Sequence, residues 1–387
     1  MSEWKKVKLG DCCEITSSKR CHASERSKEG IPFYCSKEII LLENGEEVRD
    51  SDFIPVELYE SIKHKYDVPK PGDLLLTTRG TNGIPYIYKD KDCFYFADGN
   101  LSWFKNFQKE LSVRYLYYWF KSHIGKHSVD SIAKGTAQKA VPIDGLRNLD
   151  IELPSFTIQH RIATILSRYD SLIENYQKQT KLLEEAAQRL YKEWFVDLHF
   201  PSHENTKIVD GVPEGWEKKT VGEIAEFKRG KTITKKDIIE GSIPVVAGGL
   251  EPAYYCNKSN TDQRVITVSG SGANAGFTRM YFEKVWASDC SFIDCSTTEY
   301  LHFIYCYLIA NKSFLDNLQK GAAQPHVYAK DINALDVLVP SHNVINSFES
   351  VASKIFDVIA SKNNQIRNLT EARDRLLPKL MSGDIEV

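Results

Sequence analysis

The sequence lacks any long uninterrupted hydrophobic run, and its N-terminal residues contain no apolar core of the signal-peptide type. We therefore expect no membrane span and a cytosolic protein. Net charge is nearly absent as well, because 50 Lys and Arg residues balance 52 Asp and Glu residues, leaving −2 at pH 7. This balance alone argues against a protein that holds nucleic acid mainly by its own positive charge.

Closely spaced cysteine pairs are also missing. The nine cysteines include no CxxC motif, and the nearest approach, Cys290 and Cys295, has no second pair beside it. Zinc sites of the finger or ribbon type need two such pairs to complete a tetrahedron. We expect nine reduced thiols, mostly packed in the interior, with a metal site as the alternative.

Catalytic motifs are scarce. The run GSGANAG at 270–276 has the spacing G-x-G-x-x-x-G, one residue too long for a dinucleotide loop, and a strand-like run follows it instead of a helix. GKT at 230–232 lacks the first glycine of a P-loop, because Ala225 stands there. GxSxG, HExxH and an NPPY-type tetrapeptide are absent. The chain is therefore predicted to act by recognising and binding another molecule, and not as an enzyme.

What the sequence does contain is an internal repeat. GTAQKAVPIDGLRNLDIELPS begins at Gly135 and GAAQPHVYAKDINALDVLVPS begins at Gly321, so that Val141 matches Val327 at an offset of 186 residues. The openings WKKVKLGDCCEI and WEKKTVGEIAEF match at an offset of 212. The two halves therefore differ in the length of their middle segments, whereas their openings and their ends match; we call these matching segments the frame. Constant parts would build the frame, and divergent parts would carry specificity.

Each repeat continues into an apolar series with steps of four and three residues. The first series runs from Ile158 to Trp194 and includes Leu172, and the second runs from Val344 to Leu380 and includes Val358. A spacing of 3.5 residues is typical of a coiled-coil seam. It predicts two long helices that pair as a spacer, with an ordinary bundle core as the alternative.

The globular segments are predicted to combine strands and helices. Short β-rich runs cover 71–80, 84–90, 92–98, 264–272 and 279–288, and turn residues separate them. The aromatic-rich segments 113–124 and 299–311 are predicted to be amphipathic helices whose rings belong to the core. The fold class is α+β: two mixed α/β domains at 1–156 and 202–342, each with a substantial sheet and each followed by a long helix, at 157–201 and 343–387.

Polar, glycine-bearing loops occupy matching places in the two halves. Arg, Asn and Gln can form paired hydrogen bonds with base edges, whereas Ser, Thr and Lys suit phosphates. A solvated turn is the alternative for each residue alone, and a structural role is an alternative for the Gly and Gln of G-x-x-Q. The candidate DNA-binding residues are Arg79, Thr81, Asn82, Lys134, Thr136, Gln138 and Lys139 in the first half, and Ser269, Ser271, Asn274, Arg279, Lys320, Gln324 and His326 in the second.

This layout resembles the specificity subunit of type I restriction–modification enzymes over essentially the whole chain. The stretch LDIELPSFTIQHRIATILSRYDSLIENYQKQTKLLEEAAQRLYKEWF at 149–195 is similar to the first long helix region of that family. The openings that begin at Trp4 and Trp216 resemble those of its two target-recognition domains. One departure is Ile345, which stands where the family's second helix usually has a glutamine like Gln159; Ala322-Ala323 near the second G-x-x-Q is another.

The resemblance implies that each recognition domain reads one half of a bipartite DNA sequence. Two antiparallel long helices would set the spacing and give the chain a pseudo-twofold repeat. Two methyltransferase subunits would bind this frame and supply S-adenosylmethionine and adenine methylation, and restriction subunits would bring ATP, Mg and cleavage. This chain would hold no metal, no cofactor and no catalytic residue, and it would bind DNA weakly when isolated.

Other functions also agree with the residues. A protein-binding coiled-coil scaffold would show no DNA specificity even with a methyltransferase present. An enzyme, for instance a fused methyltransferase, a nuclease or a tRNA-processing protein, would be active as the isolated chain. The specificity subunit of a restriction system other than type I would share all the features above.

Overall fold

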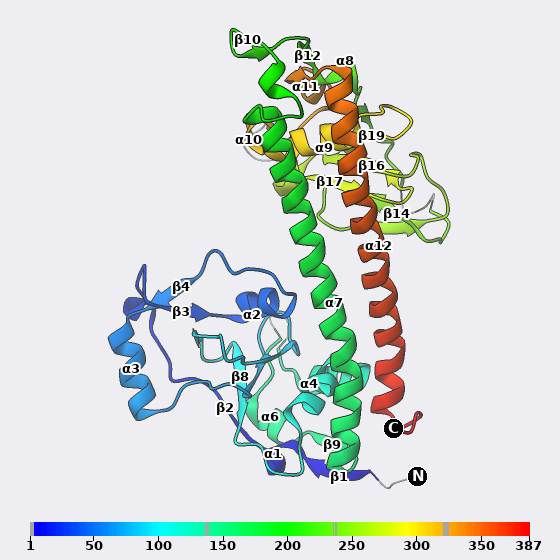
Figure 1. The fold of residues 1–387 in the computed structure, drawn as a ribbon. Helices are drawn as coiled ribbons and strands as arrows, with labels where there is room; N and C mark the ends of the chain where they lie inside the picture. The colour runs from blue at the N-terminus through cyan, green and yellow to red at the C-terminus, as the bar shows by residue number, and fades with distance from the viewer. Residues whose placement is uncertain (1–3, 136–138, 235, 237, 320–324) are drawn as a thin grey trace. The chain divides into compact units, whose positions relative to one another are not determined.

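The computed structural model describes the chain except for residues 1–3, 136–138, 235, 237 and 320–324. The chain forms two compact units. The first comprises Met1–Asn175 together with Gln365–Val387, and the second comprises Tyr176–Asn364. Each unit therefore contains one globular part and a portion of both long helices (Figure 1).

The first unit is built on a four-stranded antiparallel sheet with the order β2-β8-β5-β6. Its central strand β5 is buried at every position, as the apolar run at 71–80 predicts. A second sheet has the order β4-β3-β7, in which β3 and β7 are parallel, and β1 pairs with β9. The strands are β1 Lys5–Lys8, β2 Glu14–Thr16, β3 Ile31–Tyr34, β4 Asp52–Ile54, β5 Leu74–Thr77, β6 Pro85–Ile87, β7 Tyr95–Phe96, β8 Leu101–Lys105 and β9 Asp150–Leu153.

Short helices cover these sheets. The aromatic face of α4 is buried against β5, β8 and the adjoining helices, so the expectation that these rings belong to the core is confirmed. The helices are α1 Leu9–Cys12, η1 Ala23–Glu25, α2 Ser36–Glu43, α3 Val56–Lys65, α4 Val113–Lys121, α5 His123–Ile132 and α6 Ile143–Arg147.

The second unit repeats this architecture strand for strand. Its sheets have the orders β13-β19-β16-β17, β15-β14-β18 and β12-β20, again with one parallel pair, β14 and β18, and it adds a small hairpin, β10-β11. The strands are β10 Ile208–Val209, β11 Val212–Pro213, β12 Glu217–Thr220, β13 Lys228–Arg229, β14 Ile243–Val246, β15 Tyr254–Cys256, β16 Val265–Ser269, β17 Thr278–Tyr281, β18 Trp286–Ala287, β19 Cys290–Asp294 and β20 Asp336–Val339.

The helices α8, α9, α10 and α11 of the second unit correspond to α1, α4, α5 and α6, whereas α2 and α3 have no counterpart among its described helices. The α9 helix corresponds to the aromatic α4 and lies in the core beside the long helices. The elements are η3 His203–Asn205, α8 Val221–Ile224, η5 Gly272–Asn274, α9 Leu301–Ala310, α10 Lys312–Asn317 and α11 Ala329–Asn333. The predicted α+β repeat is thereby confirmed.

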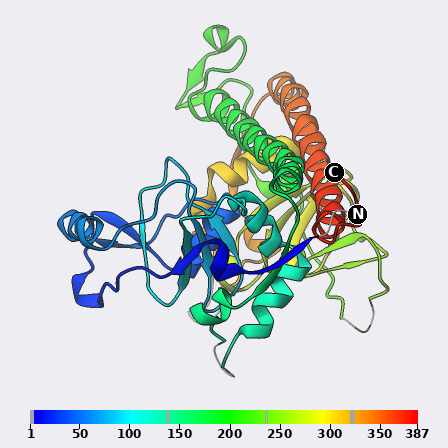
Figure 2. The same cartoon turned by 90° about the horizontal axis from the view of Figure 1, so that it is seen from below.

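Two long helices, α7 Phe156–Tyr191 and α12 His342–Met381, lie side by side and antiparallel (Figures 1 and 2). In the first unit Arg373 of α12 pairs with Asp170 of α7. In the second unit the Lys362 ammonium lies 4.3 Å from the centroid of the Tyr176 ring. α7 ends in a π-helical turn, η2 Lys192–Val196, so the regular helix stops earlier than the predicted end at residue 201.

The seam of the long helices differs by one residue from the heptad prediction in their middle parts. Leu172 and Val358 are 43% and 44% exposed, whereas the next residues, Ile173 and Ile359, are 8% and 1% exposed. The prediction for Leu172 and Val358 is therefore wrong. Each long helix contacts a globular part as well as its partner helix, so both contacts determine which residues are buried.

Gln159 connects the start of α7 to the globular part of the first unit. Its side chain is fully buried, accepts a hydrogen bond from the Ser112 N–H at 2.9 Å, and donates to the carbonyls of Glu110 and Pro154 at 2.7 and 2.9 Å. The counterpart Ile345 is buried among apolar side chains in the second unit. The start of the long helix is therefore attached to the globular part by hydrogen bonds in the first unit and by apolar packing in the second.

Candidate nucleic-acid interface

The loop after β5 in the first unit is closed by its own backbone. The N–H of Gly83 donates to the Thr77 carbonyl at 2.8 Å, and the Thr77 N–H donates to the Ile84 carbonyl at 3.0 Å. Gly80 and Gly83 adopt φ values of 81° and 82°, which side chains rarely allow, so the glycines permit the tight return. Arg79 is exposed on this loop.

A second segment, residues 139–141, is fastened to this loop. The Val141 N–H donates to the Thr78 carbonyl at 2.9 Å, and Arg79 forms an isolated β-bridge with Ala140. The side-chain amide of Asn82 donates to the Lys139 carbonyl at 3.3 Å. The structure therefore brings together the two predicted groups of polar residues in this half, with the exposed Lys134 and Lys139 beside Arg79 and Asn82.

The second unit contains the same junction. After β16, the Gly276 N–H donates to the Ser269 carbonyl at 2.9 Å and closes the loop. The Val327 N–H donates to the Gly270 carbonyl at 3.1 Å, and Ser271 forms a β-bridge with His326. Val141 and Val327 are the residues that the sequence repeat aligns at an offset of 186. The predicted matching positions are thus equivalent in three dimensions.

The other predicted residues differ in their surroundings. Thr81 is exposed on the loop, and Asn274 is partly exposed at the end of η5. Ser269 is 3% exposed within β16, and its hydroxyl donates to the Gly248 carbonyl at 3.1 Å. Arg279 lies in β17 and donates to the Leu250 carbonyl at 2.8 Å. Ser269 and Arg279 therefore stabilise the structure around the loop. The predicted residues Thr136, Gln138, Lys320 and Gln324 lie outside the described residues.

A polar cavity of 380 Å³ adjoins the loop of the second unit. Three residues that sequence reasoning missed, Arg229, Asp289 and Tyr328, line it together with the predicted Ser271 and His326. The rings of His326 and Tyr328 stack with centroids 5.9 Å apart. Arg229 directly precedes the rejected GKT motif. A basic residue next to a glycine at the end of a strand was therefore the feature of the sequence that could have marked Arg229 as a candidate. Nothing in the sequence distinguished Asp289.

Cys290 forms part of the wall of this cavity. Burial raises the pKa of its thiol to about 12, so it remains neutral at physiological pH. Six of the nine cysteines are buried: Cys12, Cys13, Cys21, Cys256, Cys290 and Cys306. In the described ranges, no group of three or more His, Cys, Asp or Glu side chains is placed to hold a metal ion.

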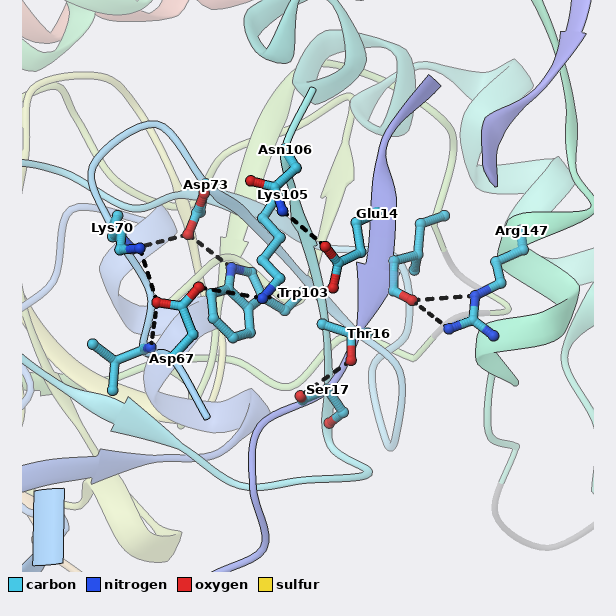
Figure 3. A network of polar contacts seen from close by, with 12 residues as sticks. Glu14, Thr16, Ser17, Asp67, Lys70, Asp73, Trp103, Lys105, Asn106 and Arg147 are labelled. Carbon is cyan, nitrogen blue, oxygen red and sulfur yellow. Dashed lines mark hydrogen bonds and ion pairs between the residues drawn. The ribbon is translucent and has the colours of Figure 1, made fainter. Parts of the chain in front are cut away.

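The opposite end of the first unit's four-stranded sheet is held by an ionic network (Figure 3). Lys105 Nζ lies 3.3 Å from the Asp67 carboxylate and 4.2 Å from the centroid of the Trp103 ring. The Trp103 indole donates to Asp73 at 2.8 Å. Burial raises the pKa of Asp73 despite this bond. Burial would also raise the pKa of Asp67, but hydrogen bonds from Lys70, the Val68 N–H and Lys105 together lower it.

Known proteins share this repeated organisation. The sequence profile described as the type I restriction modification DNA specificity domain matches residues 1–185 and again residues 213–370. The chain belongs to this family. The resemblance predicted from the sequence is thereby confirmed, and each match of the family profile covers most of one globular part together with part of a long helix.

Relatives in the type I specificity family extend over most of the chain. It is 29% identical over 343 residues to the type I restriction enzyme MjaIX specificity subunit of Methanocaldococcus jannaschii, covering 82% of this chain and 78% of that protein. It is 22% identical over 477 residues to the HindI specificity subunit of Haemophilus influenzae, with both chains covered completely. The crystal structure of the S subunit from M. genitalium superposes with a TM-score of 0.62 at 19% identity, covers 98% of this chain and 96% of that one, and has the same fold.

None of the described helices is both long enough and apolar enough to cross a bilayer.

Proposed function

We propose that this type I specificity chain reads a bipartite DNA sequence, one part with each globular half. The observation that carries the proposal is the repeated loop junction. Equivalent backbone bonds, Val141 to Thr78 and Val327 to Gly270, hold the two loops on the equivalent sheets of the two units. The side chains of the two loops differ. A constant backbone with divergent polar groups suits a pair of sites that recognise different base sequences.

The long helices would set the distance between the two DNA segments and bind two methyltransferase subunits. Exposed apolar side chains on both helices support this part of the proposal. Leu172 and Leu182 on α7, and Val351 and Val358 on α12, are all more than one-third exposed. Apolar residues outside the seam of a paired helix offer area that a partner helix can bury.

The chemistry would belong to the partner subunits. S-adenosylmethionine would bind the methyltransferase subunits, and ATP and Mg would bind the restriction subunits. This chain would supply the choice of sequence, and its partners would supply much of the attraction to phosphates, since its own net charge is −2. We therefore expect weak DNA binding by the isolated chain at physiological salt.

A domain exchange tests the proposal. Residues 205–342 are replaced by the second recognition domain of a relative with a different target, and the hybrid is expressed with the neighbouring methyltransferase. Sequencing of methylated adenine should show that one part of the target motif changes and the other does not. A change in both parts, or in neither, contradicts modular reading. The absence of any sequence motif with the unaltered chain would favour the protein-binding scaffold.

A further inference from the structure

The cavity in the second unit contains two ionic side chains without an ionic partner. Among the described residues, neither Arg229 nor Asp289 takes part in an ion pair. Arg229 is exposed at the end of β13, where it pairs in register with Ser291 of β19. Asp289 lies in the turn just before β19, so the strand register places both residues at the same end of the sheet.

Asp289 is held in place by the loop junction. Its carbonyl accepts a hydrogen bond from the Gly270 N–H at 3.1 Å, and its carboxylate accepts one from the Ser271 hydroxyl. A carboxylate has about four lone-pair sites, so most of its capacity to accept hydrogen bonds remains. A negative charge beside DNA phosphates is unfavourable unless it receives hydrogen bonds from a donor on the DNA. Among bases in the major groove, the amino groups of cytosine and adenine are such donors.

Comparison with the first unit separates the features of this site that are the same in both units from those that differ. The Thr78 N–H donates to the Asn100 carbonyl at 2.8 Å, as the Gly270 N–H does to Asp289. Asn100 is therefore the counterpart of Asp289. The amide of one half replaces the carboxylate of the other, and the backbone bond is kept.

The arginine also changes position between the halves. Thr16 of β2 pairs with Trp103, and Lys228 of β13 pairs with Phe292 at the equivalent place, so Ser17 after β2 is the counterpart of Arg229. At the equivalent positions on the loops after β5 and β16, the two residue types are exchanged: the first unit has Arg79 and the second has Ser271. Each half therefore has one arginine and one serine at these two positions, but exchanged. Such variation on a constant backbone indicates a role in specificity and not in folding.

We propose that the cavity of the second unit reads a G·C base pair, with Arg229 donating to guanine O6 and N7 and Asp289 accepting from cytosine N4. An arginine and a carboxylate that face the same groove match the acceptors and the donor that this pair displays side by side. Ser271 is a positioning residue that orients the Asp289 carboxylate. The inference rests on the proposed function, because it specifies what one of the two halves recognises.

The test uses the full chain co-expressed with its methyltransferase, with methylated adenines sequenced for four variants. Arg229→Lys keeps the charge but loses the paired hydrogen bonds, and Asp289→Asn keeps the shape but loses the charge. Both should reduce discrimination about 5- to 150-fold at one and the same base pair. Ser271→Ala should weaken it less at that pair. Asp210→Asn, on the exposed β10-β11 turn, is the matched control and should leave the motif unchanged.

The outcomes separate this inference from the proposed function. If the unaltered chain directs no bipartite motif, the proposed function itself fails. If it does, three results overturn only the reading of G·C: the Arg229 and Asp289 variants change different base pairs, they act on different parts of the motif, or they leave it unchanged. A variant that keeps the melting temperature of the unaltered chain but directs methylation at no site also contradicts it. Arg229→Lys keeps the test decisive if Asp289→Asn does not fold.

Discussion

The guanidinium of Arg373 donates a 2.7 Å hydrogen bond to the carboxylate of Asp170. The same carboxylate accepts a 2.6 Å hydrogen bond from the Tyr118 hydroxyl. These three side chains belong to α12, α7 and α4, so one carboxylate joins both long helices to the globular part of the first unit. Because the Arg373 and Asp170 side chains are only 19% and 28% exposed, water cannot fully replace these bonds.

Asp170→Ala should lower the free energy of unfolding by about 1–3 kcal/mol, because the Tyr118 phenol loses its acceptor and the partly buried Arg373 guanidinium keeps only its bonds to Asp374. Thermal unfolding of the purified chain measures the change. Glu371→Ala removes an exposed partner of Arg375 one helical turn away and should cost less than about 0.5 kcal/mol. Equal losses in the two variants would contradict the role given to Asp170.

Gln159→Leu should destabilise the first unit by about 1–3 kcal/mol, because one backbone N–H and two backbone carbonyls lose their partner together and the bond to the Pro154 carbonyl is fully buried. The counterpart Ile345→Gln should also destabilise, since it places an amide among apolar side chains. Chemical denaturation of both variants checks the pair. If Gln159→Leu left stability unchanged, the glutamine would not be what fastens α7 to its globular part.

Asp67→Asn should reduce stability at pH 7 and lose its effect in acid. The pKa of Asp67 is below its ordinary value in the folded state, so its ionised form stabilises the fold above pH about 4, and this contribution disappears as pH falls through the folded-state pKa. The side chain is 34% exposed, so we expect only about 0.3–1 kcal/mol. Asn tolerates the φ of 83° found here, so the variant isolates charge.

Urea unfolding of the Asp67→Asn variant and the unaltered chain at pH 7 and pH 3 makes the comparison. Asp50→Asn, at an exposed position, is the control for a general effect of removing one negative charge. A difference between Asp67→Asn and the unaltered chain that grows in acid would contradict the assignment.

Arg79→Ser should relax base choice only in the part of the motif read by the first globular half, by about 5- to 150-fold at one position. The substitution installs the residue found at the equivalent position 271. Sequencing of methylated adenine from cells that express the variant with its methyltransferase provides the measurement. Arg49→Ser, with a side chain 83% exposed, is the control and should leave the motif intact. An effect of Arg79→Ser on the other part of the motif would argue against independent halves.

The segments that both halves share could be predicted well from the sequence, because they occur twice in it. Matches such as Val141 with Val327 marked segments that make the same backbone bonds in both units. The apolar run at 71–80 marked a central strand because burial on both faces requires it. The aromatic helices followed from periodicity and were found where expected. The predicted strand at 279–288 is instead two strands, β17 and β18, which belong to different sheets.

The parts that escaped prediction depend on register. The cavity joins Arg229, Ser271, Asp289 and His326 from four separate segments, and only the pairing of β13, β16 and β19 brings them together. Ser269 belongs to the strand and not to the loop, because the hydrogen bonds that close the loop begin at its own backbone. A shift of one residue in the helix seam had a similar origin, since contacts with the globular parts helped to select the buried face.

The hydrogen bonds that join Val141 to Thr78 and Val327 to Gly270 link backbone groups only. The side chains at positions 79 and 100 take no part in these bonds, and those of Ser271 and Asp289 add one hydrogen bond to each other. Under the proposed function, a lineage of such chains would change these residues one at a time while keeping the backbone bonds of the scaffold, so its target sequence would drift by single substitutions. The same property makes the two loops suitable positions for a randomised library selected for new methylation motifs.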